Sequence, residues 1–292
     1  MKKIALWIAA VFVLAACDKI EKPYKVEHPK VLISVDTPQF EVIDRALQKI
    51  LVEEYTGHKC SNCPAGRVTI EELTAAMKDT LVVLALHAGV DGQVKPDLEL
   101  DLCDKGFGND YRTAAGNQYA KDFGISKLPV AVFNRTRWND KYEQERPNWK
   151  EVAGMLPRTQ AGQGLQIIPV WNEAADTLFV FVNATLFNDA SRSMRLTVLM
   201  SEDSIMSPQM NTTPYGANPV ICDYVHSHML RANISPIDGT ALKIASAGES
   251  VICAYALKWS SLWKKNDSHI IAFISDADTH EVLQAEECKL KE

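Results

Sequence analysis

The sequence predicts an α/β layered domain followed by an all-β sandwich. Strand-like and helix-like segments alternate from residue 31 to about residue 160, which is typical of an α/β layer fold. Beyond Gly162-Gln163-Gly164, short strand-like runs recur with turn residues between them and little helical spacing. That second pattern is typical of an antiparallel β-sandwich. The 292 residues suit two domains of ordinary size, which we place at 31–160 and 163–292.

The first predicted domain has a strand–helix–strand unit at its centre. Residues 49–55 (KILVEEY) read as a strand that ends at the turn Thr56-Gly57. Residues 64–78 have helical spacing, and Pro64 falls in the first turn, where its missing N–H does no harm. Residues 81–86 (LVVLAL) are apolar throughout, as expected of a strand buried on both faces. The remaining predicted elements are a strand at 31–35, a loop at 88–110, a helix at 111–123, a strand at 129–133 and a helix at 149–156.

The second predicted domain consists of short strands with one long interruption. The strand-like runs lie at 165–171, 177–185, 194–201, 249–257, 270–275 and 281–290. Residues 211–238 read as an irregular excursion that holds Cys222, His226 and His228. The strands therefore flank one extended loop.

The N-terminus has the pattern of a lipoprotein signal peptide. Lys2 and Lys3 precede an uncharged apolar run at 4–14, which is too short for a transmembrane helix of about 20 residues. Leu14-Ala15-Ala16-Cys17 then places small residues before a cysteine, as in a lipobox. We predict a signal peptide at 1–16, lipid attachment at Cys17 and a flexible tether at 17–30. An ordinary signal peptide or a short N-terminal anchor is the alternative.

Composition restricts the partners and the compartment. The net charge of −6 argues against nucleic acid, which favours basic surfaces. The predicted partners are a membrane, through lipid on Cys17, and exported protein thiols. Export also implies an oxidising compartment. Of seven cysteines, six remain after lipidation, so full pairing is allowed, with Cys222–Cys253 as one option.

Cys60 and Cys63 stand where the first strand meets the first helix. A cysteine at a helix N-terminus is stabilised as a thiolate by unpaired N–H groups and the helix dipole, and Lys59 and His58 add to this effect. A thiolate is the species that attacks a disulfide. The spacing therefore predicts a redox-active dithiol in which Cys60 attacks and Cys63 resolves.

Two other interpretations of the pair remain open. A plain structural disulfide is common in exported proteins. Half of a zinc site is less well supported, because His226 and His228 are only one residue apart and lie in the other predicted domain.

Leu128-Pro129 before an apolar strand resembles the thioredoxin superfamily, in which a cis-proline faces the cysteine pair. The resemblance implies that Pro129 lies beside Cys60 and shapes a peptide groove. It also implies a buried carboxylate for proton transfer, supplied by Glu53 or Glu54. These residues point to opposite faces of a strand, so only one can serve, and we favour Glu53 because residues 50–52 then align with the apolar run before that acid. Copper-delivering members imply a further role for His87, although their cysteines are spaced one residue wider.

Three segments resemble a narrower family, the twenty-eight-kilodalton outer membrane proteins of Gram-negative anaerobes. They are residues 52–64 (VEEYTGHKCSNCP), 223–231 (DYVHSHMLR) and 282–285 (VLQA). The resemblance implies an outer-membrane lipoprotein with a thioredoxin-like domain and an immunoglobulin-like β-sandwich. Lys59 and Ser61-Asn62 depart from the residues usual in redox thioredoxins.

Two functions follow as hypotheses. The first is thiol–disulfide exchange on exported proteins at a site made of Cys60, Cys63, Pro129 and Glu53, with no cofactor. The alternative is a non-enzymatic surface-binding or adhesion lipoprotein, in which the β-sandwich makes the contacts and the cysteines form a structural bridge.

Overall fold

The computed structural model describes residues 35–100, 102–103, 106–212 and 219–291. The predicted signal peptide, the tether and Cys17 lie outside these residues, as does nearly all of the strand predicted at 31–35. Contacts divide the chain into residues 1–36 and 37–292, and the second unit contains every helix and strand described below. Within the described part of the chain, no helix is both long enough and apolar enough to cross a membrane.

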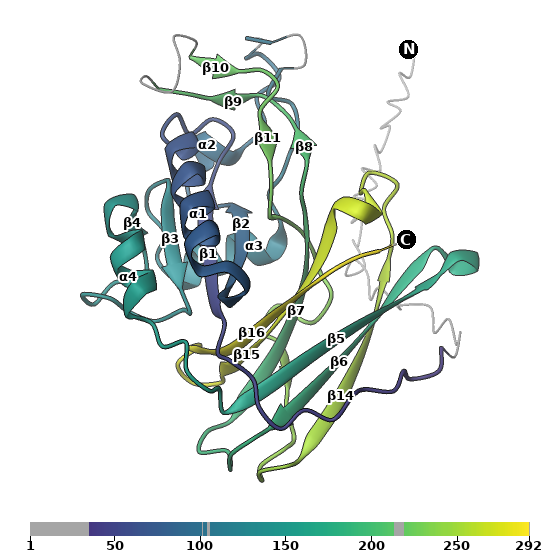
Figure 1. Cartoon of the computed structure of the whole chain (residues 1–292). Coiled ribbons are helices and arrows are strands. Elements are labelled where there is room, and N and C mark those ends of the chain that lie inside the picture. Colours follow the sequence, from purple (N-terminus) through teal and green to yellow (C-terminus); the bar gives the residue numbers. More distant parts are fainter. Residues whose placement is uncertain (1–34, 101, 104–105, 213–218, 292) are drawn as a thin grey trace, which may run out of the picture. The chain divides into compact units, whose positions relative to one another are not determined.

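A nine-stranded mixed sheet runs through the second unit (Figure 1). Its strand order is β16-β15-β7-β12-β2-β1-β3-β4, and β13 pairs with β7. β1 and β2 are parallel, whereas β3 runs antiparallel to β1. The strands of this sheet are β1 (Ile50–Thr56), β2 (Leu81–His87), β3 (Val130–Phe133), β4 (Gln144–Glu145), β7 (Met194–Glu202), β12 (Met229–Asn233), β13 (Thr240–Ala241), β15 (Ser268–Asp276) and β16 (Val282–Lys289).

Helices cover both faces of the sheet around β1. The even-numbered residues Ile50 and Val52 share a buried apolar cluster with Ile70 of α1 (Cys63–Met77) and Trp149 of α4 (Trp149–Met155). The odd-numbered residues point to the other face, because side chains alternate along a strand. There they join residues of α3 (Ala114–Asp122) in a second cluster. A short helix, α2 (Asp91–Val94), lies in the segment predicted as a loop.

The later part of the chain adds a second layer. β5 (Gln163–Asn172), β6 (Thr177–Leu186) and β14 (Ser250–Lys258) form an antiparallel three-stranded sheet. Alternate apolar residues of β6 and β7, such as Val180 and Val198, meet in one core between this sheet and the nine-stranded one. The fold is therefore mostly β, with a mixed sheet and few helices.

Strand β12 joins the two parts of the nine-stranded sheet. It pairs antiparallel with β7, and Met229 also lies opposite Ala85 of β2 in the parallel direction. The Ala85 N–H donates to the carbonyl of His228 at 2.7 Å. The prediction of an irregular segment at 211–238 is therefore wrong for this strand. Its five residues, with Arg231 in the middle and a bulge, give too short a pattern to recognise.

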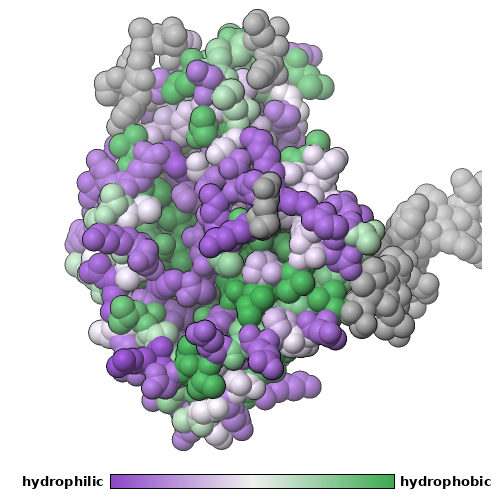
Figure 2. Space-filling model, turned by 45° about the vertical axis from the view of Figure 1, so that its right-hand side comes forward, coloured by the Kyte–Doolittle hydropathy of each residue, from purple (hydrophilic) through white to green (hydrophobic). Residues whose placement is uncertain are grey.

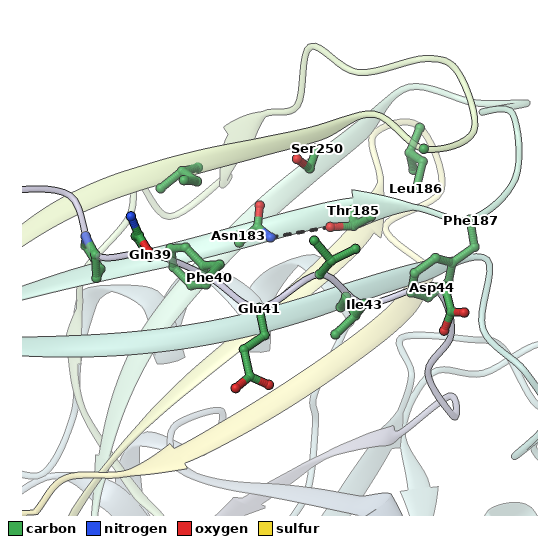
Figure 3. Close-up of a pocket in the computed structure, with 14 residues that line it drawn as sticks. Gln39, Phe40, Glu41, Ile43, Asp44, Asn183, Thr185, Leu186, Phe187 and Ser250 are labelled. Carbon is green, nitrogen blue, oxygen red and sulfur yellow. Dashed lines mark hydrogen bonds between the residues drawn. The ribbon is translucent and has the colours of Figure 1, made fainter.

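Residues 38–44 lie over the outer surface of the three-stranded sheet (Figure 3). They line a groove of about 800 Å³ together with Asn183, Thr185, Ser250 and other residues of β6 and β14. The groove has no cysteine or histidine in its lining. The chemistry predicted from sequence therefore lies elsewhere, at the end of β1.

Candidate functional site

Cys60 and Cys63 form a disulfide at the start of α1. Their Cα atoms are 5.4 Å apart, and Cys60 and Cys63 are only 1% and 2% exposed. The turn before them requires Gly57, since a Cβ there would lie 2.6 Å from the carbonyl oxygen of Gln93. The predicted pair is thus present at the strand–helix junction, in its oxidised form and covered.

Pro129 and Glu54 approach α1 at Gly66. The Leu128-Pro129 peptide bond is cis. A Cβ built on Gly66 would lie 2.8 Å from Oε1 of Glu54 and 3.2 Å from Cβ of Pro129. Because Gly66 is one helical turn after Cys63, the carboxylate and the proline both lie beside the helix that carries the cysteines.

Glu53 points to the opposite face of β1. Its two carboxylate oxygens accept hydrogen bonds from Nε and Nη2 of Arg135 at 2.9 and 2.7 Å. The guanidinium in turn lies 4.2 Å from the ring centroid of Tyr119 on α3. The preference for Glu53 as the carboxylate near the cysteines does not agree with this placement, which favours Glu54.

The Glu54 carboxyl group is buried, and its hydrogen-bonding capacity is incompletely satisfied. Glu54 is 3% exposed, and its Oε1 has no hydrogen-bond partner among the described residues. Burial raises its pKa to about 7, against a lowering effect of Arg67 and a further raising effect of Glu71. Near neutral pH, this carboxyl group can therefore either hold or release a proton.

A segment from the second half of the chain covers the cysteine loop. We call residues 205–212 the strap; they include β8 (Ile205–Met206) and β9 (Gln209–Met210). The Met210 N–H donates to the carbonyl of His58 at 2.8 Å, and the Thr212 N–H donates to the carbonyl of Ser61 at 2.9 Å. The Gln209 side-chain amide donates to the carbonyls of Cys60 and Gly57 at 2.8 and 3.1 Å. These bonds explain why the pair is buried.

A second disulfide fixes the strap's surroundings. Cys103, from the segment after α2, bonds to Cys222 near β10 (Val220–Ile221), which pairs with β9. The Cys222–Cys253 option is therefore wrong, and Cys253 and Cys288 are free thiols. Sequence could not assign this pairing, because it joins two irregular segments 119 residues apart.

Removing this second disulfide is expected to open the strap. In Cys103→Ser/Cys222→Ser, we expect Cys60–Cys63 to be reduced by a phosphine about tenfold faster or more, because loss of a long-loop disulfide typically costs about 2–4 kcal/mol. Alkylation followed by mass spectrometry at successive times measures the rate. Cys253→Ser/Cys288→Ser is the matched control. Equal rates in both variants would mean that the Cys103–Cys222 disulfide does not hold the strap closed.

Three buried histidines gather beside the pair. His58 precedes Cys60, His87 ends β2, and His226 belongs to β11 (Val225–His226), which pairs with β8. The ring centroid of His87 lies 6.1 Å from that of His58 and 5.5 Å from that of His226. Burial lowers the pKa of all three, that of His226 to about 3. Sequence reasoning gave His226 only a structural role, since its approach to His87 depends on the strap.

His228 is separated from this group. Its N–H donates to Oδ1 of Asp203 at 2.6 Å, and its ring lies 3.6 Å from the same carboxylate. His226 therefore lies beside His87, whereas His228 lies beside Asp203. Among the residues that the structure describes, no three His, Cys, Asp or Glu side chains are arranged to hold a metal ion.

Comparison with known proteins identifies one family. The family model described as "Outer membrane protein Omp28" matches residues 116–292, which is more than half of the chain and begins after the cysteine pair. No curated protein matches. A domain of the outer membrane lipoprotein Omp28 from Porphyromonas gingivalis is similar at 15% identity over 45% of this chain and 89% of that one, with a TM-score of 0.32. A structural-genomics protein from Agrobacterium tumefaciens is similar at 12% identity over 87% and 97% of the two chains, with a TM-score of 0.47.

Proposed function

Because the chain belongs to the Omp28 outer membrane protein family, we propose that this outer-membrane lipoprotein carries a covered thiol–disulfide site at Cys60 and Cys63. Its location in the cell envelope exposes it to an oxidising compartment. Lipid on Cys17 attaches it to the membrane, and exported proteins that carry thiols are its substrates.

The arrangement around the cysteines supports a thioredoxin-like half. The parallel strands β1 and β2 are linked by α1, which begins at Cys63, and Pro129, just before β3, approaches α1 at Gly66. In this proposal Cys60 is the attacking residue, Cys63 is the resolving residue, and Pro129 shapes the surface that receives the substrate peptide.

The state of Glu54 is the observation that carries the proposal. A buried carboxyl group without a full set of partners is costly, and a purely structural disulfide gains nothing from having one beside it. A redox pair does gain, because its resolving cysteine must take up and release a proton. We therefore propose Glu54, in place of Glu53, for the proton-transfer role that the thioredoxin resemblance implies.

The reaction balances with a substrate dithiol as the reductant. One substrate thiolate attacks Sγ of Cys60, the Cys60–Cys63 bond breaks, and Cys63 leaves as a thiolate that takes the proton of Glu54. The second substrate thiol then attacks the mixed disulfide, so the substrate closes to its own disulfide and Cys60 leaves as a thiol. Glu54 regains the proton that the first substrate thiol had lost. The reverse sequence oxidises the pair.

The burial of the cysteine pair favours a second candidate function, in which the disulfide is structural. With Cys60 1% exposed, a substrate reaches the sulfur only after the strap moves. If the strap never moves, the disulfide is structural and the protein acts as a surface-binding lipoprotein. Figure 2 shows apolar residues gathered near the middle of one otherwise largely hydrophilic face, as at a docking surface.

A redox titration separates the two functions. We expect the Cys60–Cys63 pair of the Cys253→Ser/Cys288→Ser variant to exchange with a dithiol buffer at a potential above about −300 mV. Trapping by alkylation and peptide mass spectrometry resolves this pair from Cys103–Cys222. A pair that stays oxidised below that potential is a structural bridge. The thiol–disulfide exchange hypothesis also fails if Cys60→Ser/Cys63→Ser leaves the thiol state of envelope proteins unchanged in cells.

A further inference from the structure

A small chamber lies at the carboxyl ends of β1 and β2. Its volume is about 20 Å³. Glu54 and Thr56 of β1 lie opposite Ala85 and His87 of β2 in the strand register, so all four share one face. Arg67 of α1 and four residues of the strap and its continuation complete the lining, namely Gln209, Tyr224, His226 and Ser227.

Polar atoms in this chamber lack partners. Oε1 of Glu54, both ring nitrogens of His87 and Nε2 of His226 are buried and make no hydrogen bond to any described residue. Leaving such atoms unpaired costs about 1–3 kcal/mol each. They come from three separate segments whose residues line one small space, so a single bound species can pair with one atom from each segment.

Water fits this space better than a metal ion. A cavity of at least about 10–15 Å³ with two to four polar partners holds one water molecule. The chamber meets both conditions. The arrangement of its donors, by contrast, does not match a metal site among the described residues.

We propose that this chamber holds one water molecule that links Glu54 to His87 and His226, and that His87 is a positioning residue that sets how readily Glu54 releases its proton. The water site stands on geometry alone. Its use in catalysis rests on the proposed thiol–disulfide function.

Burial is the main reason that His87 stays neutral, because it lowers the pKa of the imidazole. His226 from β11, His58 from the cysteine loop and Arg231 from β12 all disfavour an imidazolium, and the Tyr111 ring lies 5.3 Å away by ring centroids. A neutral imidazole still donates one N–H. Through the water, that N–H stabilises the Glu54 carboxylate, in addition to the effect of Arg67. Tyr224 is the remaining titratable group in the lining, and burial keeps it protonated by raising its pKa.

Infrared titration of Glu54 in the oxidised protein tests the inference. The carboxyl stretch of Glu54 is assigned as the band that Glu54→Gln removes. His87→Leu removes the donor, and we expect it to raise the Glu54 pKa by about one unit. His87→Asn keeps a donor and should restore most of the wild-type value. His280→Asn, at an exposed position, is the matched control and should change nothing.

Each outcome bears directly on the chamber. An unchanged Glu54 pKa in His87→Leu overturns the inference, and so does stoichiometric Zn²⁺ binding by the wild type that His87→Leu abolishes. If His87→Leu does not fold, His226→Leu removes a partner on the opposite wall and should raise the same pKa. The infrared titration uses the oxidised protein and does not require reduction of the disulfide. If the cysteine pair proved inactive in exchange, the proposed function would fail, but the effect of His87 on the Glu54 pKa could still be measured.

Discussion

Replacing Arg135 with methionine is expected to lower the free energy of unfolding by about 3–5 kcal/mol, because it leaves a carboxylate buried without its partner. Glu53 is 0% exposed and Arg135 is 5% exposed, so water cannot replace the lost ion pair. The guanidinium also lies over three aromatic rings, of Tyr119, Phe123 and Phe273.

The double variant Glu53→Met/Arg135→Met distinguishes the loss of the ion pair from the cost of leaving one buried charge without its partner. We expect it to recover most of the loss, since apolar replacement of both partners is often neutral. Lys150→Met breaks the exposed Lys150–Glu72 pair and should cost under about 1 kcal/mol. Urea unfolding measures all three. A loss below about 1 kcal/mol in Arg135→Met would show that the buried pair has little stabilising effect.

Glu54→Gln is expected to remove a pH dependence of stability worth about 3 kcal/mol. The Glu54 pKa is about 7 in the folded protein and 4.5 in an unfolded chain. The folded state therefore binds this proton more tightly, and the stabilisation is fully present below pH 4.5. It is lost as the pH rises from 4.5 through 7, because the folded protein must then bury a carboxylate.

The measurement is the difference in unfolding free energy between wild type and Glu54→Gln at a series of pH values. His58, His87 and His226 have lowered pKa values and act in the opposite direction, since they favour the folded state increasingly as the pH rises towards 6.5 and add nothing further above it. Their effect is common to both proteins and cancels in the difference. A difference that stays constant from pH 4.5 to pH 8 would contradict the assignment of a titrating Glu54.

Local patterns in the sequence were sufficient for most single elements. β1, α1 and β2 were predicted within one or two residues, because their apolar spacing is regular and Pro64 marks the helix start. Pro129 approaches α1 at Gly66, and its position beside Cys60 stays a prediction.

Contacts between distant segments could not be predicted in this way. Alternation places Glu53 and Glu54 on opposite faces, but Ile50, Leu51 and Val52 are all buried, so the pattern does not say which face carries α1. The strap, the Cys103–Cys222 bond and the meeting of His87 with His226 depend on where an irregular segment returns. That return is set by packing around Phe107 and Val220.

Deleting the second half of the chain would leave the first half with an open sheet edge at β2. Ala85 of β2 would lose the carbonyl to which its N–H donates, because β12 would be absent. Unpaired strand edges promote aggregation. The first half is therefore not an independent module, and an exchange of halves between relatives must preserve the pairing of β2 with β12.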